Sequence, residues 1–345
     1  MDGPLRPPEM QATVVVVTHN SADSIQECLD SILHQGLAPK EMIVVDNAST
    51  DGTLEVLKRE FSAVNVQALS TNRGFAAAVN HAANLATGEI LAVLNPDAVA
   101  DREWLAGLVS VIQERPDAGA VTSAVLVYGT DRVNAMGMDV HVSGLGTNRF
   151  FGQPANRMAQ EVQSVPAMHG SAFACRLDRF HLVGGMNEAF FLYVEDVELS
   201  MRLRLTGFAI YLNPASIAYH RYYPEVSPEK YFLLERNRWL GLMSTFGSAT
   251  ITLLFPLLLA SELGSTGYAL VRGKPYIRSK IRAWSSLVRL MESARQRRLQ
   301  LMNHRRTSEI RVALTLGRFL SLTILRDALL RSPSRNPSLD GAFPR

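Results

Sequence analysis

Residues 89–98 read EILAVLNPDA, and this stretch decides the fold. Ile90 to Leu94 form a short apolar run, which predicts a strand buried inside a sheet. Because Pro96 has no N–H for a sheet ladder, the strand has to end and turn there. Asn95 and Asp97 then lie just beyond the carboxyl end of a strand, where open α/β sheets bind ligands. A carboxylate at this place can hold a divalent cation, although all three residues also favour an ordinary turn.

Three similar apolar runs precede this stretch, and each leads through polar residues into a helical pattern. The runs are Thr13 to Thr18, Met42 to Val45 and Val64 to Leu69. This alternation predicts βαβ units and an α/β fold with a mostly parallel sheet flanked by helices. Carboxyl ends of parallel strands share one edge, so four polar clusters are expected to form one nucleotide pocket: Thr18–Asn20, Asp46–Asp51, Asn72–Gly74 and Asn95–Asp97.

Two common nucleotide motifs are missing. No strand leads into GxGxxG and no GxxxxGK[ST] occurs, which excludes a P-loop and argues against the usual dinucleotide fold. A nucleotide is therefore expected to be held by acids and amides. The two cysteines, Cys28 and Cys175, form no CxxC pair, so a reducing compartment without a structural zinc site is expected.

A second decisive stretch is 184–204, GGMNEAFFLYVEDVELSMRLR. Glu195 and Asp196 start its helical pattern, and acids at the first turn of a helix are favoured by the helix dipole alone. The alternative is a general base. Apolar and aromatic walls such as Phe190 and Tyr193 would raise the pKa of a carboxyl group there toward neutrality.

The charge is unevenly distributed. Residues 271–345 contain 17 Lys and Arg against four Asp and Glu, so this part carries +13 and the remainder −10 of the total +3. Such a basic segment suggests an anionic partner: membrane lipid, a lipid-linked phosphate or nucleic acid. A helical face that is simply solvated is the alternative.

The basic segment follows an apolar one. Residues 249–271 are mostly apolar and long enough for a membrane span, which takes roughly 20 apolar residues. Pro256 and Glu262 interrupt this run and favour a partly inserted or interfacial helix. Residues 272–311 have apolar positions, Trp284 among them, between arginines. This pattern predicts a basic amphipathic helix on a membrane surface, or alternatively one packed on the catalytic domain.

Six motifs in fixed order resemble the family 2 glycosyltransferases, within them the bacterial rhamnosyltransferase-like branch. They are VVVVTHNS, IVVDNASTDGT, TNRGFAAAVN, LNPDA, GSAFACRLDRFHLVGGMNEAFFLYVEDVELSMRLRLTGF and YFLLERNRW. The resemblance covers about residues 12–246. It implies a GT-A fold, in which a Rossmann-like mixed sheet is flanked by helices. It also implies transfer of a sugar from a nucleoside diphosphate donor with inversion at the anomeric carbon.

The resemblance also implies roles for individual residues. Glu195 and Asp196 match the family's acidic pair, with Asp196 as the base that deprotonates the acceptor hydroxyl and Glu195 orienting either that base or the acceptor. Asp97 stands at the last position of the metal-binding DxD motif, whose first acid is replaced by Asn95 here. A divalent cation (Mg²⁺ or Mn²⁺) is implied, with Asp97 as its stronger ligand and His220 as a further metal or diphosphate contact. The residues implied to bind the nucleotide sugar are Thr18, Asn20, Asp46, Asn72, Arg73, Gly74 and Asn95.

A helical motif further on is also matched. Arg236, Asn237 and Arg238 fall in a family element that packs under the site, and either a structural cap or direct phosphate contact suits them.

These features predict four segments: a disordered N-terminus (1–10), a GT-A domain (11–246), a helical membrane-associating region that is apolar and then basic (247–331), and a disordered tail (332–345). The expected enzyme moves a sugar, foremost L-rhamnose from dTDP-rhamnose, to a lipid-linked or polysaccharide acceptor in cell-envelope glycan synthesis. It would work in the cytoplasm, peripherally on the inner face of the cell membrane, with no nucleic acid partner. A UDP-hexose donor and a non-catalytic sugar-nucleotide-binding scaffold protein are the alternatives.

Overall fold

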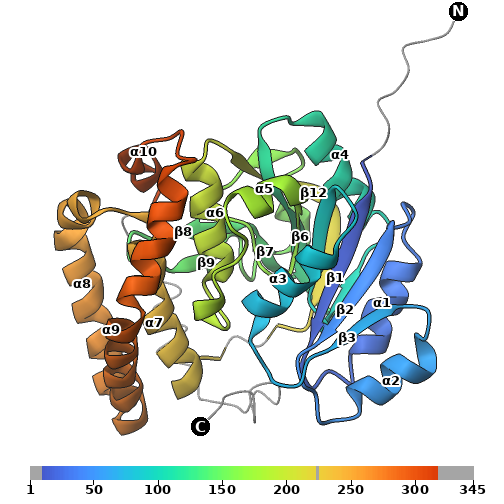
Figure 1. Cartoon of the computed structure of the whole chain (residues 1–345), viewed down its shortest axis with the longest axis horizontal. Helices are drawn as coiled ribbons and strands as arrows, with labels where there is room; N and C mark the ends of the chain where they lie inside the picture. The colour runs from blue at the N-terminus through green and yellow to red at the C-terminus, as the bar shows by residue number, and fades with distance from the viewer. Residues whose placement is uncertain (1–9, 223–224, 318–345) are drawn as a thin grey trace, which may run out of the picture.

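A computed structural model describes residues 10–222 and 225–317 (Figure 1). The predicted disordered tail (332–345), all but the last residue of the predicted disordered N-terminus (1–10), and the end of the predicted helical region (318–331) lie outside the described residues. The strands are β1 (Ala12–Thr18), β2 (Glu41–Asp46), β3 (Asn65–Ala68), β4 (Ile90–Leu94), β5 (Ala98–Ala100), β6 (Ala118–Val127), β7 (Val133–Met136), β8 (Met138–Val140), β9 (Gly146–Asn148), β10 (Gln163–Ser164), β11 (Ala172–Arg176) and β12 (Ala209–His220).

The helices follow the strands in the predicted alternation up to residue 115 and gather toward the C-terminus. They are α1 (Ile25–Leu33), α2 (Thr53–Glu60), α3 (Phe75–Leu85), α4 (Trp104–Glu114), α5 (Leu177–Leu182), α6 (Glu195–Leu205), α7 (Pro228–Thr245), α8 (Ser248–Arg272), α9 (Lys274–Met302) and α10 (Glu309–Leu314).

One mixed sheet forms the centre of the molecule, with the order β10-β12-β6-β11-β4-β1-β2-β3. β4, β1, β2 and β3 are parallel to one another, as predicted. β11 lies antiparallel between β4 and β6, and β12 runs parallel to β6. The predicted α/β fold with a mixed sheet and flanking helices is therefore confirmed.

Both faces of the sheet are buried, which explains the unbroken apolar run of β1. Val14 and Val16 pack against α1, α2 and α4 on one face. Val15 and Val17 pack against α3, α5 and α6 on the other. Each βα connection thus returns the chain across the sheet, and the polar loops are left at the carboxyl edge of the parallel strands.

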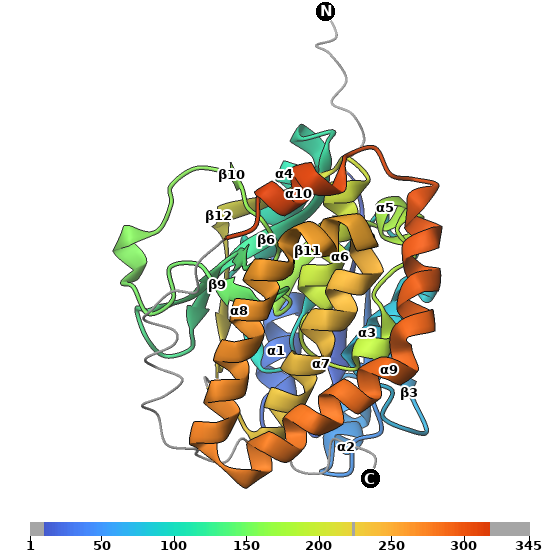
Figure 2. The same ribbon diagram turned by 90° about the vertical axis from the view of Figure 1, so that its left-hand side faces the viewer.

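The C-terminal helices form a further layer outside α6. One apolar cluster unites Val197 and Met201 of α6 with Leu240 of α7, Leu258 of α8 and Leu287 of α9. Figure 1 shows α7, α9 and α8 stacked outward from the sheet at one end of the molecule, and Figure 2 shows α8 and α9 as a hairpin in front of α7.

Candidate active site

The carboxyl ends of β1 and β2 meet in a buried hydrogen bond. Thr18 Oγ1 donates to Asp46 Oδ1 at 2.8 Å, and both side chains are fully buried. Ser49 donates its N–H and its hydroxyl to the same carboxylate, at 3.0 and 2.5 Å. Thr18 and Asp46 therefore hold the loop that follows β2, and the atoms of this loop stand at the sheet edge.

This loop is bonded to the loops that follow β1 and β3. Asn20, whose φ is 52°, donates its N–H to Ser49 Oγ at 2.9 Å and accepts from the N–H of Thr50 at 2.8 Å. Asn47 Oδ1 accepts the N–H of Arg73 at 2.8 Å. The structure thus brings together three of the predicted polar clusters. Asn47 lies in the predicted Asp46–Asp51 cluster, but no role of its own was predicted for it.

The loop after β3 also touches the segment before α6. Asn72 Oδ1 accepts the N–H of Gly74 at 2.9 Å, and Gly74 has a φ of +83°. A Cβ on Gly74 would lie 2.4 Å from the carbonyl oxygen of Phe191, which accepts the N–H of Phe75 at 2.7 Å. Only glycine permits this approach. The loop after β3 and the segment that leads into Glu195 are therefore in direct contact.

The turn after β4 lies beside a second backbone segment, residues 169–171. The N–H of Asn95 donates to the carbonyl of Ser171 at 2.8 Å. The side chain of Asn95 is partly exposed and bonds to no described residue, so its amide can meet a ligand. His169 Nδ1 lies 2.7 Å from Ser171 Oγ. Burial, and to a lesser extent the charge of His220, lowers the pKa of His169 to about 3, so its ring is neutral.

Asp97 faces His220. The two come together because β5 pairs antiparallel with β12, which sets His220 opposite Ala98. His220 Nε2 lies 3.2 Å from Asp97 Oδ1, and its Nδ1 donates to Asn134 Oδ1 at 2.9 Å. With Nδ1 as the donor, a neutral ring turns the lone pair of Nε2 toward a carboxylate oxygen. Two facing acceptors at this distance need a proton or a cation between them.

This donor set fits a divalent cation. A carboxylate oxygen and an imidazole nitrogen suit Mn²⁺, and an outer hydrogen bond such as that from His220 to Asn134 is the usual way to orient a ligating histidine. No group of three His, Cys, Asp or Glu side chains gathers within residues 10–222 and 225–317. Any further ligands would therefore come from a substrate and from water.

Asp196 and Glu195 open α6 and are both almost fully buried. Asp196 Oδ2 accepts the N–H of Gly170, and Oδ1 accepts the N–H of Val197, both at 2.8 Å. Glu195 Oε2 has no hydrogen-bond partner among the described residues. Burial raises the pKa of both carboxyl groups, more for Glu195, where the charge of Asp196 adds to it, than for Asp196, where the two N–H groups oppose it.

The turn before the acidic pair has a strained backbone. Phe191, Tyr193 and Val194 all have positive φ, at 65°, 70° and 73°. Asn237, fully buried on α7, stabilises this turn because its Nδ2 donates to the carbonyls of Phe190, Leu192 and Tyr193 at 3.0, 2.8 and 2.8 Å. Arg236 Nη2 donates to the carbonyls of Ala189 and Phe190 at 3.0 and 2.7 Å.

Two further groups lie near the acids. Burial, followed by the charges of Glu195, Tyr222 and Asp97, raises the pKa of the Tyr193 phenol. Lys230 Nζ lies 5.2 Å from the centre of the Tyr193 ring, and burial lowers the pKa of this amine to about 8. Lys230 was not predicted, because nothing near it in the sequence marks it apart from other helical lysines.

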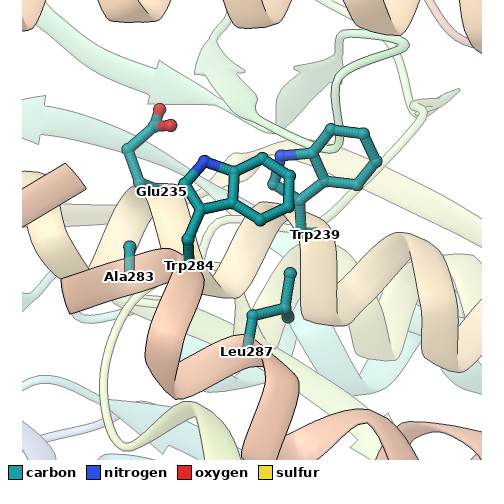
Figure 3. Close-up of a pocket in the computed structure, with 5 residues that line it drawn as sticks. All are labelled: Glu235, Trp239, Ala283, Trp284 and Leu287. Carbon is teal, nitrogen blue, oxygen red and sulfur yellow. The ribbon is translucent and has the colours of Figure 1, made fainter. Parts of the chain in front are cut away.

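Arg238, next to Asn237, points the other way and pairs with Glu235 and Glu262 of α8. Lys280 of α9 pairs with the same two acids. Figure 3 shows the recess above this network, lined by Glu235, Trp239, Ala283, Trp284 and Leu287, with the two indoles facing each other across α7 and α9. Arg238 therefore belongs to the helix layer and not to the acid site.

The comparisons with known proteins agree with this arrangement. Residues 13–180 match the model of glycosyl transferase family 2. The chain is 26% identical over 232 residues to N-acetylglucosaminyl-diphospho-decaprenol L-rhamnosyltransferase of Mycobacterium tuberculosis, which covers 60% of this chain and 75% of that protein. It is 31% identical over 215 residues to the O-antigen biosynthesis protein RfbC of Myxococcus xanthus, covering 58% of this chain and 16% of that protein.

A solved structure shares the fold. The crystal structure of GalNAc-T7 with UDP, GalNAc and Mn²⁺ superposes with a TM-score of 0.59 at 17% identity, and the match covers 74% of this chain and 52% of that one. The predicted GT-A fold is therefore confirmed, as is the predicted enzyme class. Residues 13–180 thus match a family 2 glycosyltransferase domain, and the relatives together with the fold indicate a glycosyltransferase.

Proposed function

We propose that this enzyme transfers L-rhamnose from dTDP-rhamnose, with inversion, to a lipid-linked or polysaccharide acceptor in cell-envelope glycan synthesis. The name of the Mycobacterium rhamnosyltransferase relative supports the choice of sugar. The observation that carries the transferase part of the proposal is the tripeptide 169–171. Its Gly170 N–H holds Asp196, its Ser171 carbonyl holds Asn95, and its His169 ring lies 6.2 Å from that of His220. One short segment thus connects a buried acid to the residues that face a donor diphosphate.

We assign Asp196 as the base. Its carboxylate takes the proton of the acceptor hydroxyl while the hydroxyl oxygen bonds to the anomeric carbon, and the bond from that carbon to the nucleoside diphosphate breaks. Two backbone N–H groups fix the carboxylate, and the raised pKa makes it a stronger base than an exposed aspartate. Glu195, buried and without a partner for Oε2, orients the acceptor.

The nucleotide would lie along the loops after β1, β2 and β3. We propose that Asn20, Asn72, Arg73 and Gly74 line its pocket and that Asn95 meets the diphosphate with its amide. Thr18 and Asp46 would act through the loop that they hold, because their side chains are fully buried.

Asp97 and His220 would hold Mg²⁺ or Mn²⁺, with Asn134 orienting the imidazole. A bound cation would neutralise charge on the departing diphosphate. Lys230, close to Tyr193, would supply a positive charge in addition to the cation, near the proposed diphosphate site.

The relatives support a lipid-linked acceptor at a membrane. The Mycobacterium relative is named for a diphospho-decaprenol acceptor, which is a membrane lipid. One described helix, Ser248–Arg272, is long and apolar enough to cross a membrane. We therefore propose that the enzyme works in the cytoplasm, peripherally at the inner face of the cell membrane.

The test is turnover and binding across a panel of nucleotide sugars, with dTDP-rhamnose and UDP-hexoses included, in the presence and absence of Mn²⁺. Asp196→Asn should abolish turnover and retain donor binding, while Asp97→Asn should weaken donor binding in Mn²⁺. Turnover of a UDP-hexose and not of dTDP-rhamnose would mean that the donor is a UDP-hexose. Tight donor binding without turnover under every condition would favour the non-catalytic scaffold.

A further inference from the structure

The outer surface of α8 is apolar and has no charged side chain over most of its length. Only 11% of the most apolar part of this helix is buried inside the structure. Leu253 and Leu263 are each 66% exposed, and Phe255, Leu259 and Leu270 are exposed as well. Between residues 249 and 271 the single charged residue is Glu262. A surface of this kind is not typical of a helix that faces water.

Glu262 is turned inward and fixed. Its carboxylate pairs with Arg238 of α7 and with Lys280 of α9, and it accepts the indole N–H groups of Trp239 and Trp284 at 3.1 and 3.2 Å. Burial alone would raise the pKa of Glu262, but the contacts with Lys280 and Arg238 lower it to about 2. The charged side chain at the middle of α8 is thus neutralised inside the protein.

This anchor determines how α8 can meet a bilayer. If α8 crossed the membrane, the ion pairs of Glu262 would lie near the centre of the hydrocarbon, together with Glu235 and the first half of α9. α9 carries eight Lys and Arg and one Glu. Charges at the bilayer centre are costly, whereas a helix lying at the headgroup boundary needs only one apolar face.

α9 continues the apolar surface and then adds charge. Ile281, Trp284, Val288 and Met291 are exposed at helical spacing, and Trp284 is on the flank that contacts Glu262 of α8. The exposed cations Lys274, Arg278 and Arg289 have no carboxylate partner among the described residues. A continuous apolar surface with unpaired cations along α9 is complementary to the acyl chains and headgroups of an anionic bilayer.

We propose that this docking face, the exposed side of α8 with the Ile281–Met291 stripe of α9, inserts into the headgroup–acyl boundary of an anionic bilayer, with α8 lying along the surface and not crossing it. The inference deepens the membrane part of the proposed function. Vesicle binding is measured without any sugar nucleotide, so it does not depend on whether the donor and the base are correctly assigned.

The first experiment is co-sedimentation of the full chain with vesicles of phosphatidylcholine alone or with added phosphatidylglycerol. Leu259→Glu/Leu263→Glu should weaken binding to both by about tenfold or more, because apolar insertion contributes to both. The matched control is Leu33→Glu/Leu182→Glu, which alters two exposed leucines on α1 and α5. Equal binding of the two double variants would overturn the proposal.

The second variant pair separates charge from insertion. Arg278→Glu/Arg289→Glu should remove the preference for phosphatidylglycerol and its sensitivity to salt, while Arg59→Glu/Arg102→Glu, with the same change in charge on α2 and before α4, should not. An unchanged lipid preference in the first variant would contradict the anionic bilayer as the partner. A cooperative thermal unfolding transition like that of the wild type shows that each variant is folded.

Topology is tested by single cysteines at the two ends of α8. Ala249→Cys and Val271→Cys should both react with an impermeant maleimide added outside sealed vesicles, while the native Cys28 and Cys175 are buried. Protection of one end alone would show a crossing helix and overturn the proposal. A dimer in vesicle-free solution that dissociates in the Leu259→Glu/Leu263→Glu variant would also overturn the proposal. The docking face would then be covered by a second copy of the chain.

The two proposals can fail separately. Vesicle binding that follows the variants as stated, together with no turnover of any nucleotide sugar, would leave the docking face standing and remove the activity. Sugar transfer to a soluble acceptor without vesicle binding would leave the proposed activity standing and remove the docking face.

Discussion

The N–H of Gly170 donates to Asp196 Oδ2 at 2.8 Å, and a methyl group added to Gly170 would lie 3.0 Å from that same oxygen. This contact fixes the carboxylate that we assign as the base. It also explains why a residue without a side chain stands between His169 and Ser171.

Gly170→Ala should displace this carboxylate and lower kcat by about 10–100-fold, since a shift of around 1 Å in a reacting group has such an effect. Steady-state kinetics with the donor that the nucleotide-sugar panel identifies would measure the change in kcat. Gly267→Ala is the control, because a Cβ there meets no described atom within 4 Å. A raised KM with kcat unchanged would instead place Gly170 in substrate binding.

The value of kcat/KM should rise with pH, and the midpoint of this rise should lie above the ordinary aspartate pKa of about 3.9. A base works only as the carboxylate, and burial raises the pKa of Asp196, so protonation blocks it at a higher pH than for an exposed aspartate. The pH profile of kcat/KM measures this rise. A residual activity of Asp196→Asn that shows the same rise would exclude Asp196 as its origin.

Glu195→Gln should make the protein more stable in alkali while lowering activity. The folded-state pKa of Glu195 lies above its unfolded value, so the stability it contributes is present at low pH and is lost as pH rises through the folded pKa. A neutral amide avoids that loss, which we expect to be about 1–3 kcal/mol at pH 9 and near zero at pH 5. Urea unfolding at both pH values measures the difference, with the exposed Glu188→Gln as control. An equal effect at both pH values would contradict the explanation.

Asn237→Leu should reduce both stability and turnover. The change leaves three buried carbonyls of the strained turn without the donor they share, at a cost of about 1–3 kcal/mol. Thermal unfolding and donor turnover would be measured beside Asn303→Leu at the exposed end of α9. Full activity with lowered stability would show that the acidic pair keeps its position without the turn.

Asn134→Leu should weaken Mn²⁺ binding by about 10–100-fold, because an outer hydrogen bond orients a ligating imidazole. The electron paramagnetic resonance signal of free Mn²⁺ titrated with protein measures the affinity directly, with or without a nucleoside diphosphate. Asn65→Leu on the edge strand β3 is the control. Unchanged affinity would mean that His220 is not a ligand.

The strands that decide the fold could be predicted because each is a short apolar run with clear ends. Residues 90–94 are buried on both faces as expected, and the loops of parallel strands meet for a reason that holds for any such sheet. The contacts of Asn47 and the burial of Asp46 inside its own loop depend on hydrogen bonds that no spacing in the sequence specifies. The assigned roles of the site residues stay predictions until they are tested.

Other parts of the site depend on pairings between distant segments. Asp97 meets His220 because the short strand β5 pairs with β12, and Asn134 joins them from the excursion after β6. The sequence shows no periodic pattern that marks the three residues of β5. It shows none either for the bulge in β12 between Asn213 and Ile217. Asn237 and Lys230 reach the site from α7, whose apolar pattern shows a buried helix but not its partner.

Asn237 and Arg238 are neighbours on α7 whose side chains project about 100° apart and meet different partners. The first holds the turn before the acidic pair, and the second holds Glu262 on α8. A rotation or a one-residue insertion in α7 would move both contacts together. On the proposed assignments, a change in how the docking face meets a bilayer would have to keep the register of α7, or the proposed base would lose its position. If both proposals hold, orientation at the bilayer and chemistry at the sugar depend on the same helix.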